Sequence, residues 1–227
     1  MLFVWGHRFY GHHDEVDRQH GMTRFGHLWF LPLFPMKALW ITDARRKLGH
    51  PMRMTLRGVA HGYVRAWGLV VGLIALLAGL ADGNLPAIGF GVVSLGLAVA
   101  SLAGRRMRQE RSLRRARYTR MTLGTACDPM VMAAEIAEAL QPAAASEWAR
   151  RAGTRTPDDV ARLGAESLEQ AAAAYTLLRL SARLERGAKG RRARATSEKI
   201  LDATTELRLD GAPYRDELPA SVEAPSV

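Results

Sequence analysis

The residues in this sequence best suited to chemistry are its histidines, all seven of which lie within the first 61 residues. His12, His13 and His20 flank a short acidic stretch, residues 14–17. Imidazole nitrogens and carboxylate oxygens together suit zinc or another divalent cation. Their spacing, however, matches no established ligand frame, such as two histidines one helical turn apart. We therefore expect a polar loop between strands, with a metal site on His12, His13 and His20 as the alternative.

Motifs for covalent or phosphoryl chemistry are missing from the sequence. The only cysteine, Cys127, excludes an intramolecular disulfide and a thiolate zinc site within one chain. Neither Gly-x-Ser-x-Gly nor a phosphate-binding Gly-x4-Gly-Lys-Ser/Thr loop occurs. Asp158 and Asp159 are adjacent, so a helix cannot turn both toward one site, and they are better explained as capping charges. The prediction is a protein that is not an enzyme and has no catalytic residue and no cofactor.

Two uncharged apolar runs, residues 66–81 and 83–104, are parted only by Asp82. At 1.5 Å per residue the second run spans about 33 Å, enough for the roughly 30 Å hydrocarbon core of a bilayer, and the first can be lengthened at its start. Two helices that are apolar on every face would otherwise need a large apolar core, which the Arg-rich remainder does not offer. We predict a transmembrane hairpin over residues 58–104, with helices at about 64–81 and 85–104.

Small residues recur along both apolar runs. Gly68 and Gly72 stand four residues apart, the spacing that lets helix backbones approach closely. Such a pair serves either a homodimer face or the packing of the two hairpin helices on each other, and the second is its commoner use.

The net charge of +10 is concentrated beside the apolar runs. Residues 105–120 carry +7 and residues 1–65 carry +6, whereas residues 121–227 carry −2. Basic residues next to a membrane attract anionic headgroups, at about 1 kcal/mol each. The stretch has only one aromatic residue with which to stack on bases, so we expect no nucleic-acid partner. The predicted lipid-headgroup contacts are Arg65, Arg105, Arg106, Arg108, Arg111, Arg114 and Arg115.

The same charges predict the orientation. Positive residues flank the hairpin on both outer sides, while its connecting loop has only Asp82. By the positive-inside rule both termini are cytoplasmic. Since an Ala- and Arg-rich composition suggests a bacterium, we expect a multi-pass protein of the bacterial inner (cytoplasmic) membrane.

Residues 1–57 are predicted to form a small β-rich module. Aromatic and β-branched residues, which favour a pleated surface, gather in short segments. The expected strands are residues 2–5, 25–31, 37–42 and 52–56. Pro32 and Pro35 interrupt the pattern, so we expect residues 31–35 to be an edge strand or a connection.

A short motif in this module resembles a known group of proteins. Phe30-Leu31-Pro32-Leu33-Phe34-Pro35, together with Phe3-Val4-Trp5-Gly6, is similar to the aromatic-Φ-Pro-Leu-Φ-Pro pattern of small, uncharacterised bacterial zinc-ribbon-type membrane proteins. The resemblance covers roughly residues 1–42 and implies architecture rather than activity. The paired cysteines of that group are absent here, so the resemblance implies a metal-free version of the fold.

The remainder is predicted to be helical. We expect a basic juxtamembrane helix over residues 105–126 that continues the second membrane helix, an α-helical cytoplasmic domain over 127–210, and a disordered tail over 211–227. Pro142 is expected to end one helix. Thr156-Pro157 starts the clearest helix, running to about Arg186, and a turn over 187–190 precedes a last helix over 194–208.

The fold class that follows is a membrane protein with a small N-terminal β module, a two-helix transmembrane hairpin and an α-helical C-terminal cytoplasmic region. The predicted function is a non-enzymatic scaffold or interaction protein at the cytoplasmic membrane face, with anionic lipids and an unidentified protein as partners. Two alternatives are a metal-binding protein that uses the N-terminal histidines and an accessory subunit of a transporter or envelope complex.

Overall fold

The computed structural model of this chain describes residues 5–29, 31–43, 48–103 and 109–205. These residues form two compact units. The first unit combines most of the N-terminal β module with two long helices, over Met1–Glu15, His20–Trp40 and Arg53–Met107. The second combines the remaining helices with two short pieces of the β module, over Val16–Gln19, Ile41–Met52 and Arg108–Val227.

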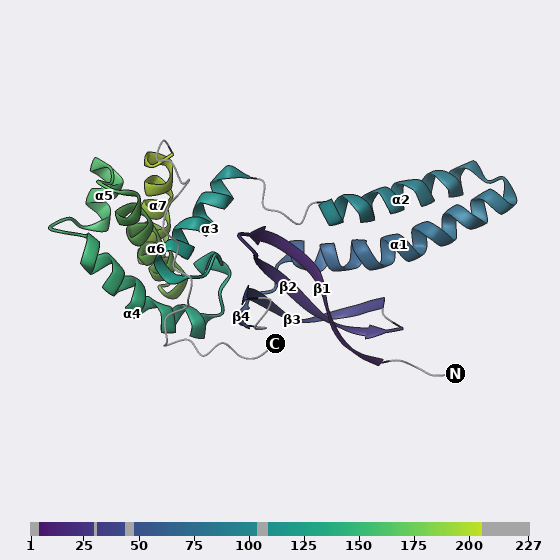
Figure 1. The fold of residues 1–227 in the computed structure, drawn as a ribbon, viewed down its shortest axis with the longest axis horizontal. Coiled ribbons are helices and arrows are strands. Elements are labelled where there is room, and N and C mark those ends of the chain that lie inside the picture. Colours follow the sequence, from purple (N-terminus) through teal and green to yellow (C-terminus); the bar gives the residue numbers. More distant parts are fainter. Residues whose placement is uncertain (1–4, 30, 44–47, 104–108, 206–227) are drawn as a thin grey trace. The chain divides into compact units, whose positions relative to one another are not determined.

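The N-terminal module is a four-stranded antiparallel sheet, as the sequence predicts, with strand order β1-β2-β3-β4. Of the strand predicted at residues 2–5, only Trp5 lies within the described residues, and β1 begins there. The predicted strands at 25–31 and 37–42 correspond to the end of β2 and to part of β3. The bounds are β1 Trp5–Val16, β2 Gln19–Leu28, β3 Leu31–Asp43 and β4 Leu48–Met52 (Figure 1).

A two-residue turn joins β1 to β2. Asp17 and Arg18 both have positive φ, 47° and 72°. This backbone is typical of the type I′ turn, whose twist matches that of the paired strands. The polar loop expected here is therefore wrong, because His12 and His13 belong to β1 and His20 belongs to β2.

β3 runs through Pro32 and Pro35, so of the two alternatives expected for residues 31–35 the structure has a strand and not a connection. Proline is tolerated where a strand lacks a neighbour on its N–H side, and β4, with 5 residues, is too short to pair with all 13 residues of β3. The strand predicted at 52–56 is wrong: β4 ends at Met52, where that strand was expected to begin, and Thr55 instead caps the first helix.

The two apolar runs form helices α1, Leu56–Asp82, and α2, Leu85–Ala103, which lie side by side in an antiparallel hairpin (Figure 1). α1 starts two turns earlier than predicted, since the side chain of Thr55 accepts a hydrogen bond from the amide of Gly58. At the far end Gly83 takes the left-handed conformation (φ 64°), and its N–H bonds to the carbonyl of Gly79. The turn chemistry expected from the sequence is present.

Glycines let α1 and α2 approach closely. A Cβ added to Gly91 would lie 2.7 Å from the backbone nitrogen of Leu76, and one on Gly72 would lie 3.1 Å from that of Leu95. A Cβ on Gly68 would meet α2 at 3.3 Å. Of the two uses of the Gly68 and Gly72 pair, these contacts favour packing within the hairpin over a homodimer face.

The first two turns of α1 pack on the sheet. Gly58 lies against the ring of His13, and Gly62 lies against the ring of Phe25. The Phe25 ring also meets Tyr63 edge-on, with 5.3 Å between ring centroids. One continuous helix therefore runs from the β module into the apolar hairpin.

The helical unit is built around α6. This helix packs against α3, α4 and α7, and four consecutive alanines, residues 171–174, are buried along it. Their small side chains permit close helix approach, and Tyr118, Tyr175, Ile200 and Leu201 fill the core between the helices. The bounds are α3 Glu110–Leu123, η1 Pro129–Val131, α4 Ala134–Arg151, α5 Pro157–Leu163, α6 Leu168–Leu184 and α7 Gly187–Ala203.

Helix α4 contradicts the expectation that Pro142 ends a helix, because it continues through that residue to Arg151. A proline in a helix interior removes one backbone hydrogen bond. Here Leu140 and Ala144, on either side of it, are both fully buried, so packing against the rest of the unit holds the two halves in line.

The single helix predicted from Thr156 to about Arg186 is two helices. Thr156 caps α5 as expected, with a reciprocal bond to Asp159. Gly164, at φ 86°, then ends α5, and Ser167 caps α6. The break follows from a conformation that favours glycine, together with a new N-cap three residues later.

The basic helix predicted at residues 105–126 corresponds to α3. Gln109 before it has an extended backbone (ψ 116°), so α3 does not continue helix α2 as we expected. The turn predicted at 187–190 is instead the first turn of α7. The tail predicted at 211–227 lies outside the described residues.

Candidate functional site

Large apolar side chains point outward along both helices of the hairpin. Both helices are long and apolar enough to cross a membrane, and only 11% of the apolar window of α1 and 17% of that of α2 is buried within the described chain. Exposing such a surface to water is unfavourable by about 25 cal/mol per Å². The side chains more than half exposed include Leu73, Ile74, Leu77, Leu80, Phe90, Val93 and Leu97.

A polar junction closes the end of this apolar surface that lies nearest the sheet. The Arg65 guanidinium donates to the carbonyl of Ser101 (2.8 Å), to its hydroxyl (3.2 Å) and to the carbonyl of His12 (2.6 Å). His61 Nδ1 lies 2.7 Å from the same hydroxyl. Because Ser101 is in the last turn of α2, its carbonyl has no partner within that helix. Arg65, predicted to contact lipid headgroups, thus caps the C-terminal end of α2 and ties it to β1.

The three candidate metal ligands are placed by the β1–β2 hairpin. The rings of His12 and His20 stack with centroids 3.8 Å apart. His13 is fully buried, and its Nδ1 donates to the carbonyl of Gly11 at 2.6 Å. Burial lowers the pKa of His13, against the opposing effect of that hydrogen bond. Within the described residues no group of three or more His, Cys, Asp or Glu side chains is arranged to hold a metal ion. In this arrangement the histidines serve packing between strands and helix.

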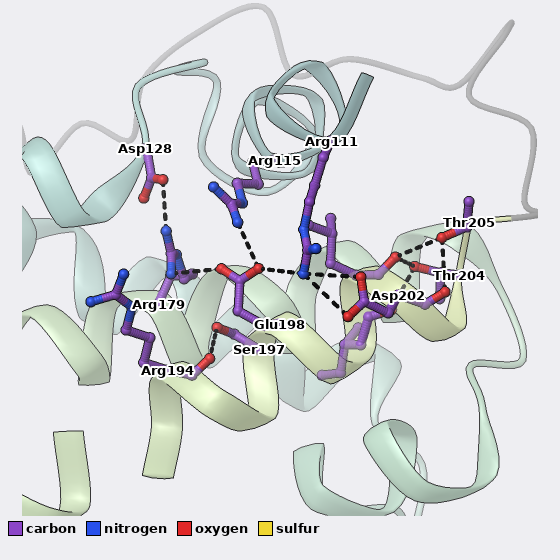
Figure 2. A network of polar contacts seen from close by, with 12 residues as sticks. Arg111, Arg115, Asp128, Arg179, Arg194, Ser197, Glu198, Asp202, Thr204 and Thr205 are labelled. Carbon is purple, nitrogen blue, oxygen red and sulfur yellow. Dashed lines mark hydrogen bonds and ion pairs between the residues drawn. The ribbon is translucent and has the colours of Figure 1, made fainter. Parts of the chain in front are cut away.

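Three arginines converge on one carboxylate in the helical unit (Figure 2). Arg115 and Arg111, from α3, lie 2.6 and 3.0 Å from Oε2 of Glu198 on α7, and Arg179, from α6, lies 3.1 Å from Oε1. Arg179 also pairs with Asp128 at 2.8 Å. Burial alone would raise the pKa of Glu198, but the hydrogen bonds and charges of the arginines, led by Arg115, outweigh it and lower that pKa. We call Arg111, Arg115, Arg179, Glu198 and Asp128 the Glu198 network.

Where the structure describes them, the basic residues predicted to contact lipid headgroups also form contacts within the chain. Arg111 and Arg115 belong to the Glu198 network. Arg114 is 5% exposed and donates to the backbone carbonyls of Thr204 and Thr205, which follow α7. These three arginines join α3 to α7. Arg105, Arg106 and Arg108 lie outside the described residues.

Sequence reasoning missed two buried polar contacts that join short β segments to the loop after α3. His50 Nε2 lies 3.0 Å from the hydroxyl of Thr125. The Gln19 side chain donates to the carbonyl of Gly124 (2.8 Å) and accepts from the amide of Ala126 (2.7 Å). Burial lowers the pKa of His50 to about 4. No local pattern reveals these pairs, because at least 75 residues separate the partners.

Comparison of this chain with protein-family models, with curated proteins and with solved structures finds no match. The resemblance of residues 1–42 to zinc-ribbon-type membrane proteins therefore stays a prediction.

Proposed function

We propose that this protein is a non-enzymatic scaffold anchored in a membrane by the α1–α2 hairpin. The observation that carries the proposal is the outward-facing apolar surface of both helices, many of whose large side chains are more than half exposed. Lipid is the surrounding that such a surface requires. The polar junction of Arg65, His61 and Ser101 lies at one end of it, as expected where a helix leaves the hydrocarbon.

The proposal includes an orientation. The basic residues stand before the apolar run of α1 and after α2, and the only charge between the two apolar runs is Asp82. The positive-inside rule then assigns the β module and the helical unit to the cytoplasmic side and residues 82–84 to the opposite side. The bacterial inner membrane is the membrane that fits this composition.

The helical unit is the part that we assign to an aqueous partner. Among its described residues, Leu163 is the only large apolar side chain with more than 36% of its surface exposed. Several of its charged residues hold its own helices together, as in the Glu198 network. A preformed, polar unit next to a membrane anchor suits the role of an interaction module, with a partner recognised through polar contacts.

Membrane fractionation tests the anchor. The full-length protein should sediment with membranes after cell lysis, resist extraction by alkaline carbonate, and enter solution only with detergent. A matched variant, Leu73→Glu with Leu77→Glu, places charges on the exposed surface of α1 and should pass largely into the carbonate-soluble fraction. Wild-type protein that stays in the aqueous supernatant after ultracentrifugation overturns the proposal.

Cross-linking in native membranes tests the scaffold. A full-length chain with a photoreactive residue in place of Glu138, which is exposed on α4, should form a discrete adduct with one protein. The same residue in place of Asp82, in the turn of the hairpin, should not form it. If the full-length protein forms no such adduct in membranes from its own host, the result argues against an interaction module.

A further inference from the structure

The turn between β2 and β3 exposes large apolar side chains at the end of the sheet. Trp29 is 55% exposed, and Leu33 and Phe34 are 39% and 44% exposed. Trp5, also 55% exposed, adds to this surface, since its ring lies 5.7 Å from that of Phe34. We call Trp5, Trp29, Leu33 and Phe34 the aromatic tip. Several large apolar side chains exposed at one end of a sheet are typical of an interaction surface.

Hydrogen bonds fix the level of the aromatic tip along α1. The Tyr63 hydroxyl donates to the carbonyl of Leu33 at 2.7 Å, and Trp67 Nε1 donates to the carbonyl of Pro32 at 2.9 Å. Figure 1 shows this end of β2 and β3 beside the first half of α1. Trp67 lies beyond the polar junction at Arg65, inside the uncharged run of the helix. The aromatic tip therefore reaches the level at which α1 is already apolar.

The length of α1 indicates how deep Tyr63 and Trp67 lie in the bilayer. Trp67 precedes Asp82, the last residue of α1, by fifteen positions, which is about 22 Å of helix. A bilayer has a hydrocarbon core of about 30 Å. With Asp82 at the far surface, Trp67 lies about 8 Å inside the near edge of that core, and Tyr63, four residues earlier, lies within about 2 Å of that edge. Tyrosine and tryptophan are enriched near that edge, where their rings meet apolar chains and their polar groups meet water or headgroups.

The geometry points to the aromatic tip as a second membrane contact, inserted into the headgroup–acyl boundary of the leaflet through which α1 enters. This inference rests on the proposed membrane anchor. The lipid boundary is the occupant that these contacts support, because the tip is continuous with the apolar hairpin through Tyr63 and Trp67. Two contacts within one compact unit, α1 and the strands packed on it, would fix the orientation of those strands on the membrane.

Quenching of the native tryptophans tests the inference without any added label. Full-length protein is reconstituted into vesicles of ordinary phosphatidylcholine or of a phosphatidylcholine brominated near the headgroup end of its acyl chains. The part of the fluorescence lost to bromine is then compared between wild type and three variants, Trp29→Phe, Trp67→Phe and Trp148→Phe. We expect a smaller bromine-dependent loss in Trp29→Phe and in Trp67→Phe, and an unchanged absolute loss in Trp148→Phe, whose residue packs in the helical unit.

The outcomes separate the inference from the proposed function. If Trp67→Phe reduces the loss but Trp29→Phe does not, the hairpin spans the membrane and the aromatic tip stays in water, so the inference is wrong. If neither variant reduces the loss, the membrane anchor itself is wrong. Circular dichroism of each variant, matched to wild type, shows that the fold is retained.

Discussion

His50 gives the helical unit a dependence on pH. Its side chain is fully buried against Thr125, and burial lowers its pKa from 6.5 to about 4. On acidification the unfolded chain takes up this proton first, so the contribution of His50 to stability is complete above pH 6.5 and is lost progressively down to about pH 4. With about 1.4 kcal/mol per pH unit, the loss approaches 3 kcal/mol. The free energy of unfolding in detergent, measured from neutral pH down to the folded-state pKa of His50, should fall accordingly.

A His50→Gln variant is the control for this prediction. Glutamine does not titrate, and its amide can still reach the hydroxyl of Thr125. The pH slope of the variant should be smaller than that of wild type between pH 6.5 and 4. A remaining slope is expected, because burial also lowers the pKa of His13. Parallel profiles for the two proteins would show that His50 does not cause the acid sensitivity.

Glu198 is the second residue whose charge matters. Its lowered folded-state pKa means that its stabilising contribution is present above its ordinary pKa of 4.5 and is lost as pH falls through the folded-state value. Glu198→Gln leaves Arg115, Arg111 and the buried Arg179 without their shared partner, so we expect a loss of about 2 kcal/mol in a denaturant titration.

Arg111→Ala is the matched control for Glu198→Gln. Its guanidinium is 46% exposed and solvent screens its pairing with Glu198, so we expect a loss of less than about 1 kcal/mol. Equal losses in the two variants would mean that the Glu198 network does not depend on its central carboxylate.

At the level of elements, the contact between α1 and α2 depends on individual glycines. Gly91→Ala places a methyl group 2.7 Å from the backbone nitrogen of Leu76, which cannot move without separating the helices. Overpacking of this kind costs about 1–3 kcal/mol, so the variant should unfold at a lower fraction of SDS in mixed micelles. Gly89→Ala, two residues earlier on the same helix, meets nothing within 4 Å and should be neutral or slightly stabilising. A stability loss in both variants would contradict this packing.

Sequence reasoning located the elements that depend on local chemistry. A structure is not needed to recognise the two apolar runs, the Gly83 turn between them or the Thr156 cap, because each depends on a few neighbouring residues. It missed the break at Gly164, although glycine followed by Ser167 is a stop signal and a start signal side by side. It also predicted that a helix ends at Pro142, whereas long-range packing lets α4 continue through that residue.

The polar residues were harder to interpret than the elements. The spacing of His12, His13 and His20 indicated a loop or a metal site, but strand pairing across an Asp17-Arg18 turn stacks two of them and buries the third. Arg111, Arg114 and Arg115 read as a basic face for lipid, and their acceptors lie more than 80 residues away on or just after α7. Charge composition alone cannot show which arginines have partners within the chain.

At the scale of the whole molecule, the proposed topology makes opposite predictions for two acidic positions. In a Cys127→Ala background, Asp82→Cys places a thiol in the turn of the hairpin, and Glu138→Cys places one on an exposed turn of α4. Positive flanks on the cytoplasmic side put residue 82 on the outer face of the inner membrane. A membrane-impermeant maleimide added to intact spheroplasts should therefore label the Asp82→Cys variant and spare the Glu138→Cys variant until the membrane is permeabilised. Labelling of both variants in intact spheroplasts would mean that the hairpin does not span the bilayer, and labelling of the Glu138→Cys variant alone would mean that the chain is inserted the other way round.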